Sequence, residues 1–211
     1  MSPSDDVDAD LLPGDEAVKT WDEDAEEPLR CTKIYYASRT HSQLEQFLAE
    51  IRKTSFEPRV VQLASRQALC VNKDVQALKH LNLMNERCME MRKGKSASQK
   101  AARTDEESAA TRKNRKKTAT CKCEYARTDV IEELADKILA TDEAVKDIEA
   151  LTRTGKGMTA CPYFASRKAQ HLCEIVLLPY QILLHQKTRS IWGVDLRDNV
   201  VVIDEAHNLL T

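Results

Sequence analysis

The sequence has few aromatic residues, few glycines and no long apolar run, and each shortage excludes a class of protein. Aromatic side chains make up 5% of the 211 residues and five residues are glycine, while 42% are apolar and 31% are charged. This composition is typical of a helix-rich globular protein that can bury one core. The longest apolar stretch, 175–184, is interrupted by Pro179 and Gln181, so it is too short and too polar to span a membrane.

The N-terminus has no basic start followed by an apolar segment, so a secretory signal peptide is not expected. Without secretion, disulfides are disfavoured. The seven cysteines are therefore better explained as metal ligands or buried thiols.

Charge is distributed unevenly along the chain. Residues 1–30 hold eleven acidic and two basic residues, a balance of −9, which leaves +7 for the rest of a chain whose net charge is −2. We interpret 1–30 as an acidic disordered linker. The basic body fits a polyanion partner, although a solvated acidic tail without a partner explains the charges equally well.

A second biased stretch, 92–120, has ten Lys or Arg, three acidic residues and almost no large apolar side chain. This composition predicts a solvated, mobile loop. Its basic cluster 112–117 fits a nuclear import signal or a DNA contact, and a loop without a partner fits it as well.

Between these segments, apolar periodicity alternates between strands and helices. Ser42 and Glu45 predict a capping box at the start of the first helix. Gly155 and Gly157 predict a turn after the last of the expected helices. The unbroken apolar run 200–203 predicts a strand buried on both faces of a parallel sheet. The fold class is therefore α/β with a helical, cysteine-bearing insert. Strands are expected at 33–37, 60–63, 174–178 and 199–203, and helices at 42–51, 67–91 and 128–153.

The run 200–203 leads directly into Asp204 and Glu205, with His207 close behind. Carboxylates at the carboxyl end of a central strand lie where α/β sheets bind ligands. In phosphoryl-transfer sites, one acid there holds Mg²⁺ and a second orients and deprotonates the attacking water. An ordinary acidic helix start is the alternative.

A polar turn, Ser38 to Ser42, follows the strand expected at 33–37. Arg39, Thr40 and His41 precede the start of a helix, whose free backbone N–H groups favour a phosphate. A phosphate-holding corner and a polar turn without a ligand are equally compatible with this pattern.

Four cysteines, Cys70, Cys88, Cys123 and Cys161, are separated by 18, 35 and 38 residues. No C-x2-C pair, the strong signature of zinc, is present. Because a tetra-thiolate cluster needs only that the fold bring four cysteines together, the chemistry alone leaves a cluster, zinc and unligated thiols open. The two cysteines beside apolar strands, Cys31 and Cys173, are expected to be core thiols.

Read in order, these motifs resemble the XPD-like iron–sulfur helicases of superfamily 2. Asp204 to His207 reads DEAH, which looks like motif II, and 38–44 looks like motif Ia. The segments 65–70, 87–88, 123–125 and 161–164 look like the four cysteine elbows of that family. The strings at 38–44, 69–72 and 160–163 are most similar to the chromosome-loss (ChlR-type) branch, with the XPD, FANCJ and RTEL branches as alternatives.

This resemblance implies roles at matching positions. Asp204 would be the Mg²⁺ ligand, Glu205 the catalytic base and His207 the link between ATP and DNA. Single-stranded DNA would contact Arg39, Thr40 and His41, while Arg66 would donate to cluster sulfurs or to DNA, a surface arginine being the alternative. A [4Fe–4S] cluster would be held by Cys70, Cys88, Cys123 and Cys161. Cys121 competes with Cys123, which we prefer because the family has an aromatic residue two positions after this ligand, where Tyr125 stands.

The same resemblance implies a fragment of an ATP-dependent 5′–3′ DNA helicase in the nucleus, acting in repair, replication and sister-chromatid cohesion. Its partners would be single-stranded or forked DNA and cohesion or replication-fork proteins, and its cofactors the cluster, ATP and Mg²⁺. Tyr180 and Gln181 would be packing residues. The expected parts are the linker 1–30, a partial RecA-like motor domain in 31–66 and 166–211, and a cluster domain in 67–165.

The sequence contains no G-x-x-x-x-G-K-[ST] loop for ATP phosphates, so we expect this chain not to hydrolyse ATP by itself. A non-catalytic module that binds single-stranded DNA, or a zinc-binding interaction domain, is the alternative.

Overall fold

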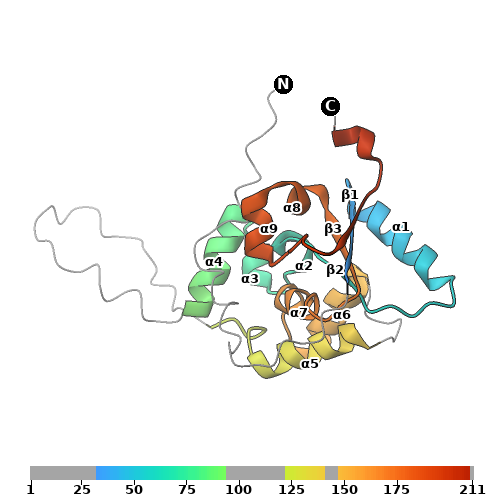
Figure 1. Cartoon of the computed structure of the whole chain (residues 1–211). Coiled ribbons are helices and arrows are strands. Elements are labelled where there is room, and N and C mark those ends of the chain that lie inside the picture. The colour runs from blue at the N-terminus through green and yellow to red at the C-terminus, as the bar shows by residue number, and fades with distance from the viewer. Residues whose placement is uncertain (1–31, 94–121, 141–146, 210–211) are drawn as a thin grey trace, which may run out of the picture.

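The computed structural model describes residues 32–93, 122–140 and 147–209 (Figure 1). The acidic segment 1–30, Cys31, most of the basic stretch 92–120 and Cys121 lie outside these residues. No helix in the described ranges is long and apolar enough to cross a membrane. The elements in chain order are β1 (Ile34–Ser38), α1 (His41–Arg52), β2 (Val60–Gln62), α2 (Arg66–Leu69), α3 (Lys73–Gln76), α4 (Leu81–Lys93), α5 (Thr128–Leu139), α6 (Ile148–Met158), α7 (Pro162–Ala169), β3 (Ile175–Pro179), α8 (Tyr180–Leu184), α9 (Gln186–Trp192), β4 (Val200–Ile203) and a 3-10 turn at Ala206–Leu209.

The four strands form one parallel sheet in the order β2-β3-β1-β4. Tyr36 on β1 lies beside Leu177 of β3 on one side and Val202 of β4 on the other. The α/β class and the parallel sheet expected from the sequence are therefore confirmed. Because β1 lies between β3 and β4, the loops that leave the carboxyl ends of these three strands are neighbours.

The two faces of the sheet are covered by different helices. Leu44 and Leu48 of α1 pack on one face against Val60 and Leu177. The opposite face, which includes Val61, belongs to the main core, where it meets apolar side chains of α5 and α7. The alternation of Val60 and Val61 between the two faces is the period of two that every strand imposes.

The chain leaves the sheet after β2 and returns in β3, although these strands are hydrogen-bonded neighbours. Helices α2 to α7 lie between them in the sequence. In Figure 1 they lie below and beside the strands. Helix α7 is the centre of this part of the molecule, because seven of its eight residues are buried.

The capping box of α1 differs from the one expected. The N-cap residue is Thr40, whose hydroxyl accepts from the backbone N–H of Gln43 at 3.4 Å, while the side chain of Gln43 accepts from the backbone N–H of Thr40 at 3.2 Å. The expected pair Ser42 and Glu45 lies inside the helix. A capping box is present as predicted, but it starts two residues earlier in the chain than predicted. The sequence did not decide its position, because several residues near the start of α1 can act as caps.

Two helices predicted as continuous are interrupted. Instead of one helix at 67–91 there are α2, α3 and α4, with Asn72 capping α3 and Lys79 at a left-handed φ of 55° before α4. The helix expected at 128–153 is replaced by α5 and α6, and Asp147 caps the start of α6. Apolar periodicity continues across such interruptions, so it does not reveal them.

The glycines expected to form a turn lie inside α6. This helix ends only at Thr159, whose left-handed φ of 55° closes it. Tertiary packing explains why one glycine is needed, because a Cβ on Gly155 would lie 2.6 Å from Pro162 Cγ and 2.8 Å from the carbonyl oxygen of Ala160.

Strand β4 is not buried on both faces as the sequence suggested. Val200 is 47% exposed, and Val201 and Val202 are each 38% exposed. Within the described residues β4 pairs only with β1, while the apolar side chains of α1 pack on β1, β2 and β3. The apolar run correctly identified a strand, but its surroundings decide its burial.

The two glycines of α6 give a matched test of this packing. We expect Gly155→Ala to lower the free energy of unfolding by about 1–3 kcal/mol, because the new Cβ overlaps Pro162 and Ala160. Gly157→Ala should raise it by about 0.5–1 kcal/mol, because a Cβ there meets nothing within 4 Å and alanine favours a helix. Urea unfolding measures both, and equal effects would contradict this account of Gly155.

Candidate functional site

One candidate site lies at the carboxyl edge of the sheet, where the loops after β1 and β4 meet. The backbone N–H of Asp204 donates to the carbonyl of Ala37 at 2.9 Å. The hydroxyl of Ser38 donates to Gln43 Oε1 at 2.8 Å and lies 3.3 Å from Asp204 Oδ2. The expected Mg²⁺ ligand is thus linked through Ser38 to Gln43, the capping-box partner of the N-cap residue Thr40.

Glu205 and His207 follow Asp204 in an exposed turn. Glu205 has a φ of 51°, the left-handed conformation that is uncommon for a residue with a Cβ. Its Oε2 lies 3.3 Å from Nδ1 of His207. Strained residues are concentrated at functional sites, and this one directly follows Asp204 in the chain.

The polar corner after β1 contains the three residues expected to contact DNA. Arg39 and Thr40 are exposed, and the guanidinium of Arg39 donates to Asn208 Oδ1 at 3.3 Å, which ties the corner to the turn after β4. His41 is half-buried, and burial lowers its pKa, so its imidazole is uncharged at neutral pH. The positive charge available to a phosphate here is therefore that of Arg39.

Tyr180, which follows β3 at the same edge, is more than the packing residue that the sequence suggested. Its ring packs in the main core, but its buried hydroxyl has no hydrogen-bond partner among the described residues. Burial raises the pKa of Tyr180, and the nearby carboxylates of Asp204 and Glu205 raise it further. The sequence signal for this proximity was the position of Tyr180 directly after a strand.

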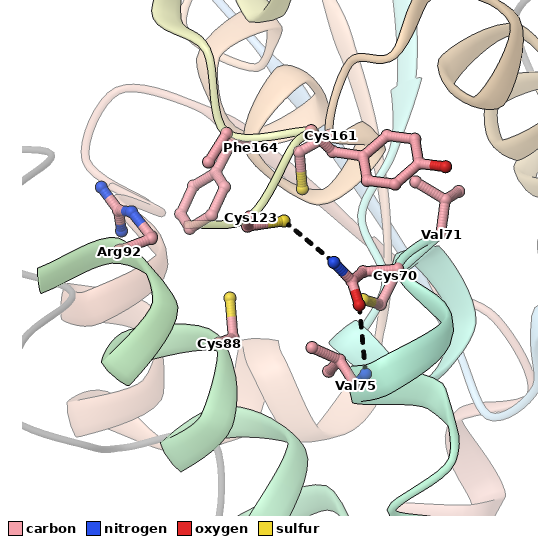
Figure 2. Close-up of a pocket in the computed structure, with 11 residues that line it drawn as sticks. Cys70, Val71, Val75, Cys88, Arg92, Cys123, Cys161 and Phe164 are labelled. Carbon is pink, nitrogen blue, oxygen red and sulfur yellow. Dashed lines mark hydrogen bonds between the residues drawn. The ribbon is translucent and has the colours of Figure 1, made fainter. Parts of the chain in front are cut away.

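A second candidate site is a pocket around four cysteines. Figure 2 shows the sulfur atoms of these cysteines directed toward a common space between α4, α7 and the loops before α3 and α5. The pocket contains about 320 Å³ of empty space, part of it open to solvent. The four are the cysteines selected from the sequence, Cys70, Cys88, Cys123 and Cys161.

Each thiol comes from a different local structure. Cys70 ends α2 and Cys88 lies within α4, whereas Cys123 lies in the loop before α5. Cys161 is the N-cap of α7, where Pro162 occupies the first helical position. The separations of 18 to 38 residues in the sequence therefore do not determine the distances between the sulfurs. The fold brings the four segments together at one pocket.

The environment of the pocket disfavours free thiolates. Burial raises the pKa of Cys70 to about 11 and that of Cys161 to about 12, and the pKa of Cys123 is raised for the same reason. Thiols with a raised pKa are protonated at neutral pH and are poor nucleophiles. Three of the sulfurs nevertheless have a backbone N–H partner two or three residues further along the chain, and these donors belong to Asn72, Tyr125 and Phe164.

Arg66 is buried rather than on a DNA-binding surface. It is 2% exposed, its guanidinium stacks 4.1 Å from the ring centroid of Tyr163, and it donates to Asn85 Oδ1 at 3.0 Å. The expected contact between Arg66 and DNA finds no support, because the side chain has almost no access to solvent. Arg66 instead holds α7 against α4, next to two of the cysteines.

The pocket is not arranged for a single metal ion. Among residues 32–93, 122–140 and 147–209, no group of three or more His, Cys, Asp or Glu side chains could hold one. The remaining cysteine in these ranges, Cys173, is fully buried in the main core, as expected.

Comparison with known proteins identifies the family of the chain. Residues 36–211 match the DEAD_2 family. The chain is 48% identical over 192 residues to the ATP-dependent DNA helicase chl-1 of Caenorhabditis elegans, covering 90% of this chain and 22% of that protein. It is 45% identical over 190 residues to the ATP-dependent DNA helicase DDX11 of Mus musculus, covering 89% and 20%.

A fungal relative, the ATP-dependent DNA helicase chl1 of Schizosaccharomyces pombe, is 34% identical over 193 residues, covering 89% of this chain and 20% of that protein. A solved structure described as an XPD helicase is similar with a TM-score of 0.46 and 16% identity, covering 84% of this chain and 25% of the other. The chain thus spans about a fifth of the length of the curated relatives it matches. The chain belongs to the DEAD_2 family and, within it, to the chromosome-loss branch of the XPD-like superfamily 2 helicases.

Proposed function

We propose that this chain forms part of the first motor domain, together with the cluster domain, of an ATP-dependent 5′–3′ DNA helicase. The observation that carries the proposal is the convergence of four cysteines, from four separate parts of the chain, on one pocket. The relatives' printed names, which describe ATP-dependent DNA helicases, support the activity.

At the sheet edge, Asp204 is proposed to hold the Mg²⁺ of bound ATP and Glu205 to take the proton of the attacking water. The positions of Asp204 and Glu205 support these roles, because both residues follow the carboxyl end of β4. The hydroxyl of Ser38 lies 3.3 Å from Asp204 Oδ2. His207, 3.3 Å from Glu205, is proposed to link the state of the nucleotide to the DNA. Arg39 and Asn208, joined at 3.3 Å, extend this link to the polar corner.

We prefer a [4Fe–4S] cluster to zinc for this pocket, because the segments around its four cysteines resemble the cysteine elbows of the iron–sulfur helicases. A tetra-thiolate cluster binds each cysteine at a separate iron atom, whereas zinc would hold all four sulfurs within about 2.3 Å of one point. When bound, the cluster would form four bonds between its iron atoms and the cysteine thiolates, and these bonds would hold the surrounding helices together. The third ligand is proposed to be Cys123, because it lines the pocket.

The DNA is proposed to run along the corner formed by Arg39, Thr40 and His41. The first two are exposed at the N-terminus of a 12-residue helix, whose free N–H groups and partial positive charge suit a phosphate.

We propose single-stranded or forked DNA as the substrate, with cohesion or replication-fork proteins as partners in the nucleus. We propose roles in repair, replication and sister-chromatid cohesion, as the resemblance to the chromosome-loss branch implies. The proposed division is motor in 31–66 and 166–211 and cluster domain in 67–165.

The cofactor assignment is tested by metal analysis of anaerobically purified full chain. We expect about four irons and four acid-labile sulfides per chain with a broad visible absorption. Cys88→Ser should abolish both, because it removes one of the four ligands.

Cys173→Ala is the matched control, since Cys173 is buried outside the pocket and should leave the iron content unchanged. A colourless protein with one zinc per chain would favour the zinc-binding interaction module, and a protein without metal would refute the metal site.

The DNA corner is tested by the salt dependence of binding to a single-stranded oligonucleotide. Arg39→Gln should weaken binding and reduce the slope of log K against log salt by about 0.7, the contribution of one lost phosphate contact. Fluorescence anisotropy between low and moderate salt measures the slope.

Arg59→Gln is the matched control because Arg59 precedes β2, at the opposite edge of the sheet, and pairs with Glu174 at 3.5 Å. Equal losses for the two variants would mean that binding follows overall charge, and the proposed corner would be wrong.

A further inference from the structure

Asn72 is the polar side chain that connects two of the four cysteines. It is 7% exposed, lies between α2 and α3, and lines the cysteine pocket. Its Nδ2 donates to Cys123 Sγ at 3.4 Å. Its backbone N–H is the donor that lowers the pKa of the Cys70 thiol against the effect of burial. One residue therefore contacts sulfurs that are 53 positions apart in the chain.

The orientation of the amide is determined by the helix that it caps. Asn72 Oδ1 accepts from the backbone N–H of Asp74 at 2.9 Å and of Val75 at 3.3 Å. A flipped amide would turn its NH2 group toward two N–H donors, so only the observed orientation satisfies the cap. The NH2 group must then face Cys123, as the dashed lines in Figure 2 show.

An N–H group directed at a ligand sulfur has two effects on a metal centre. It fixes the rotamer of the ligand, and it draws negative charge away from the sulfur. Because a reduced iron–sulfur cluster carries one more negative charge than the oxidised form, such donors stabilise the reduced form and raise the reduction potential. Asparagine suits both tasks, because aspartate could cap α3 but not donate, and serine could cap but is too short to reach the thiol.

We propose that Asn72 is a positioning residue of the cluster site, which holds Cys123 as the third ligand and raises the reduction potential of the bound cluster. This inference rests on the proposed [4Fe–4S] site. It also supports Cys123 as the proposed third ligand, since the amide that caps α3 donates to its thiol.

The test uses anaerobically purified full chain carrying its cluster. Asn72→Ser and Asn72→Asp both keep a side-chain oxygen for the cap of α3 and both lose the donor to Cys123. We expect a more negative midpoint potential in a spectroelectrochemical titration of both variants, with the larger shift in Asn72→Asp because a negative charge is added. Loss of the visible absorption in air should become about tenfold faster, the effect typical of removing an outer-shell partner.

The matched control is Gln76→Ala. Gln76 donates to the backbone carbonyl of Cys70 at 2.6 Å and touches the same loop without contacting a sulfur. It should leave the potential unchanged.

The outcomes separate this inference from the proposal on which it rests. Wild-type protein without iron would refute the cluster, and with it the role of Asn72. Wild-type protein with a cluster, and an unchanged potential in both Asn72→Ser and Asn72→Asp, would overturn only this inference and leave Asn72 as a helix cap. An equal shift in Gln76→Ala would overturn it as well, because loosening of the loop would then explain the effect.

Discussion

Burial of α7 on nearly all sides is the constraint on which the rest of the structure depends. Tyr163 carries the guanidinium of Arg66 at 4.1 Å and accepts from Arg167 at 3.0 Å, and its ring meets Trp192 edge to face with centroids 5.6 Å apart. These contacts join α7 to α2 and to α9, the helix between β3 and β4 that contains Trp192. Because Cys161 is the N-cap of α7, the packing that orders the core also sets the position of one thiol.

The parallel sheet has a similar effect on the other candidate site. Its strand order places the ends of β1, β3 and β4 side by side, so residues more than 160 positions apart share hydrogen bonds, as Ser38 and Asp204 do. The proposed nucleotide and DNA residues are thus parts of one bonded unit. The hydroxyl of Ser38 lies between Asp204 and Gln43, which takes part in the capping box of α1.

The cysteine pocket lies between two apolar clusters. Cys88, Cys161 and Phe164 belong to the main core, while Cys70 packs in a small cluster with Val75, Met84 and Met91. Two of its helices, α2 and α3, have only four residues each and would be unstable in isolation. Bonds from four thiolates to a metal centre would stabilise these short helices, as metal sites do in other small domains.

The sequence by itself determined the α/β class and the four strands within a residue or two, because these depend on local periodicity and on residue type. The two sheet-edge motifs and the four cysteines were selected by resemblance to a family, because their chemistry alone left alternatives open. Tertiary structure decided what depends on neighbours distant in the chain. It left the valines of β4 exposed and buried Arg66 against Tyr163, although each local pattern suggested the opposite. It also gave Asn72 its role, since the contact with Cys123 spans 51 residues and arises only when the loops before α3 and α5 close on one pocket.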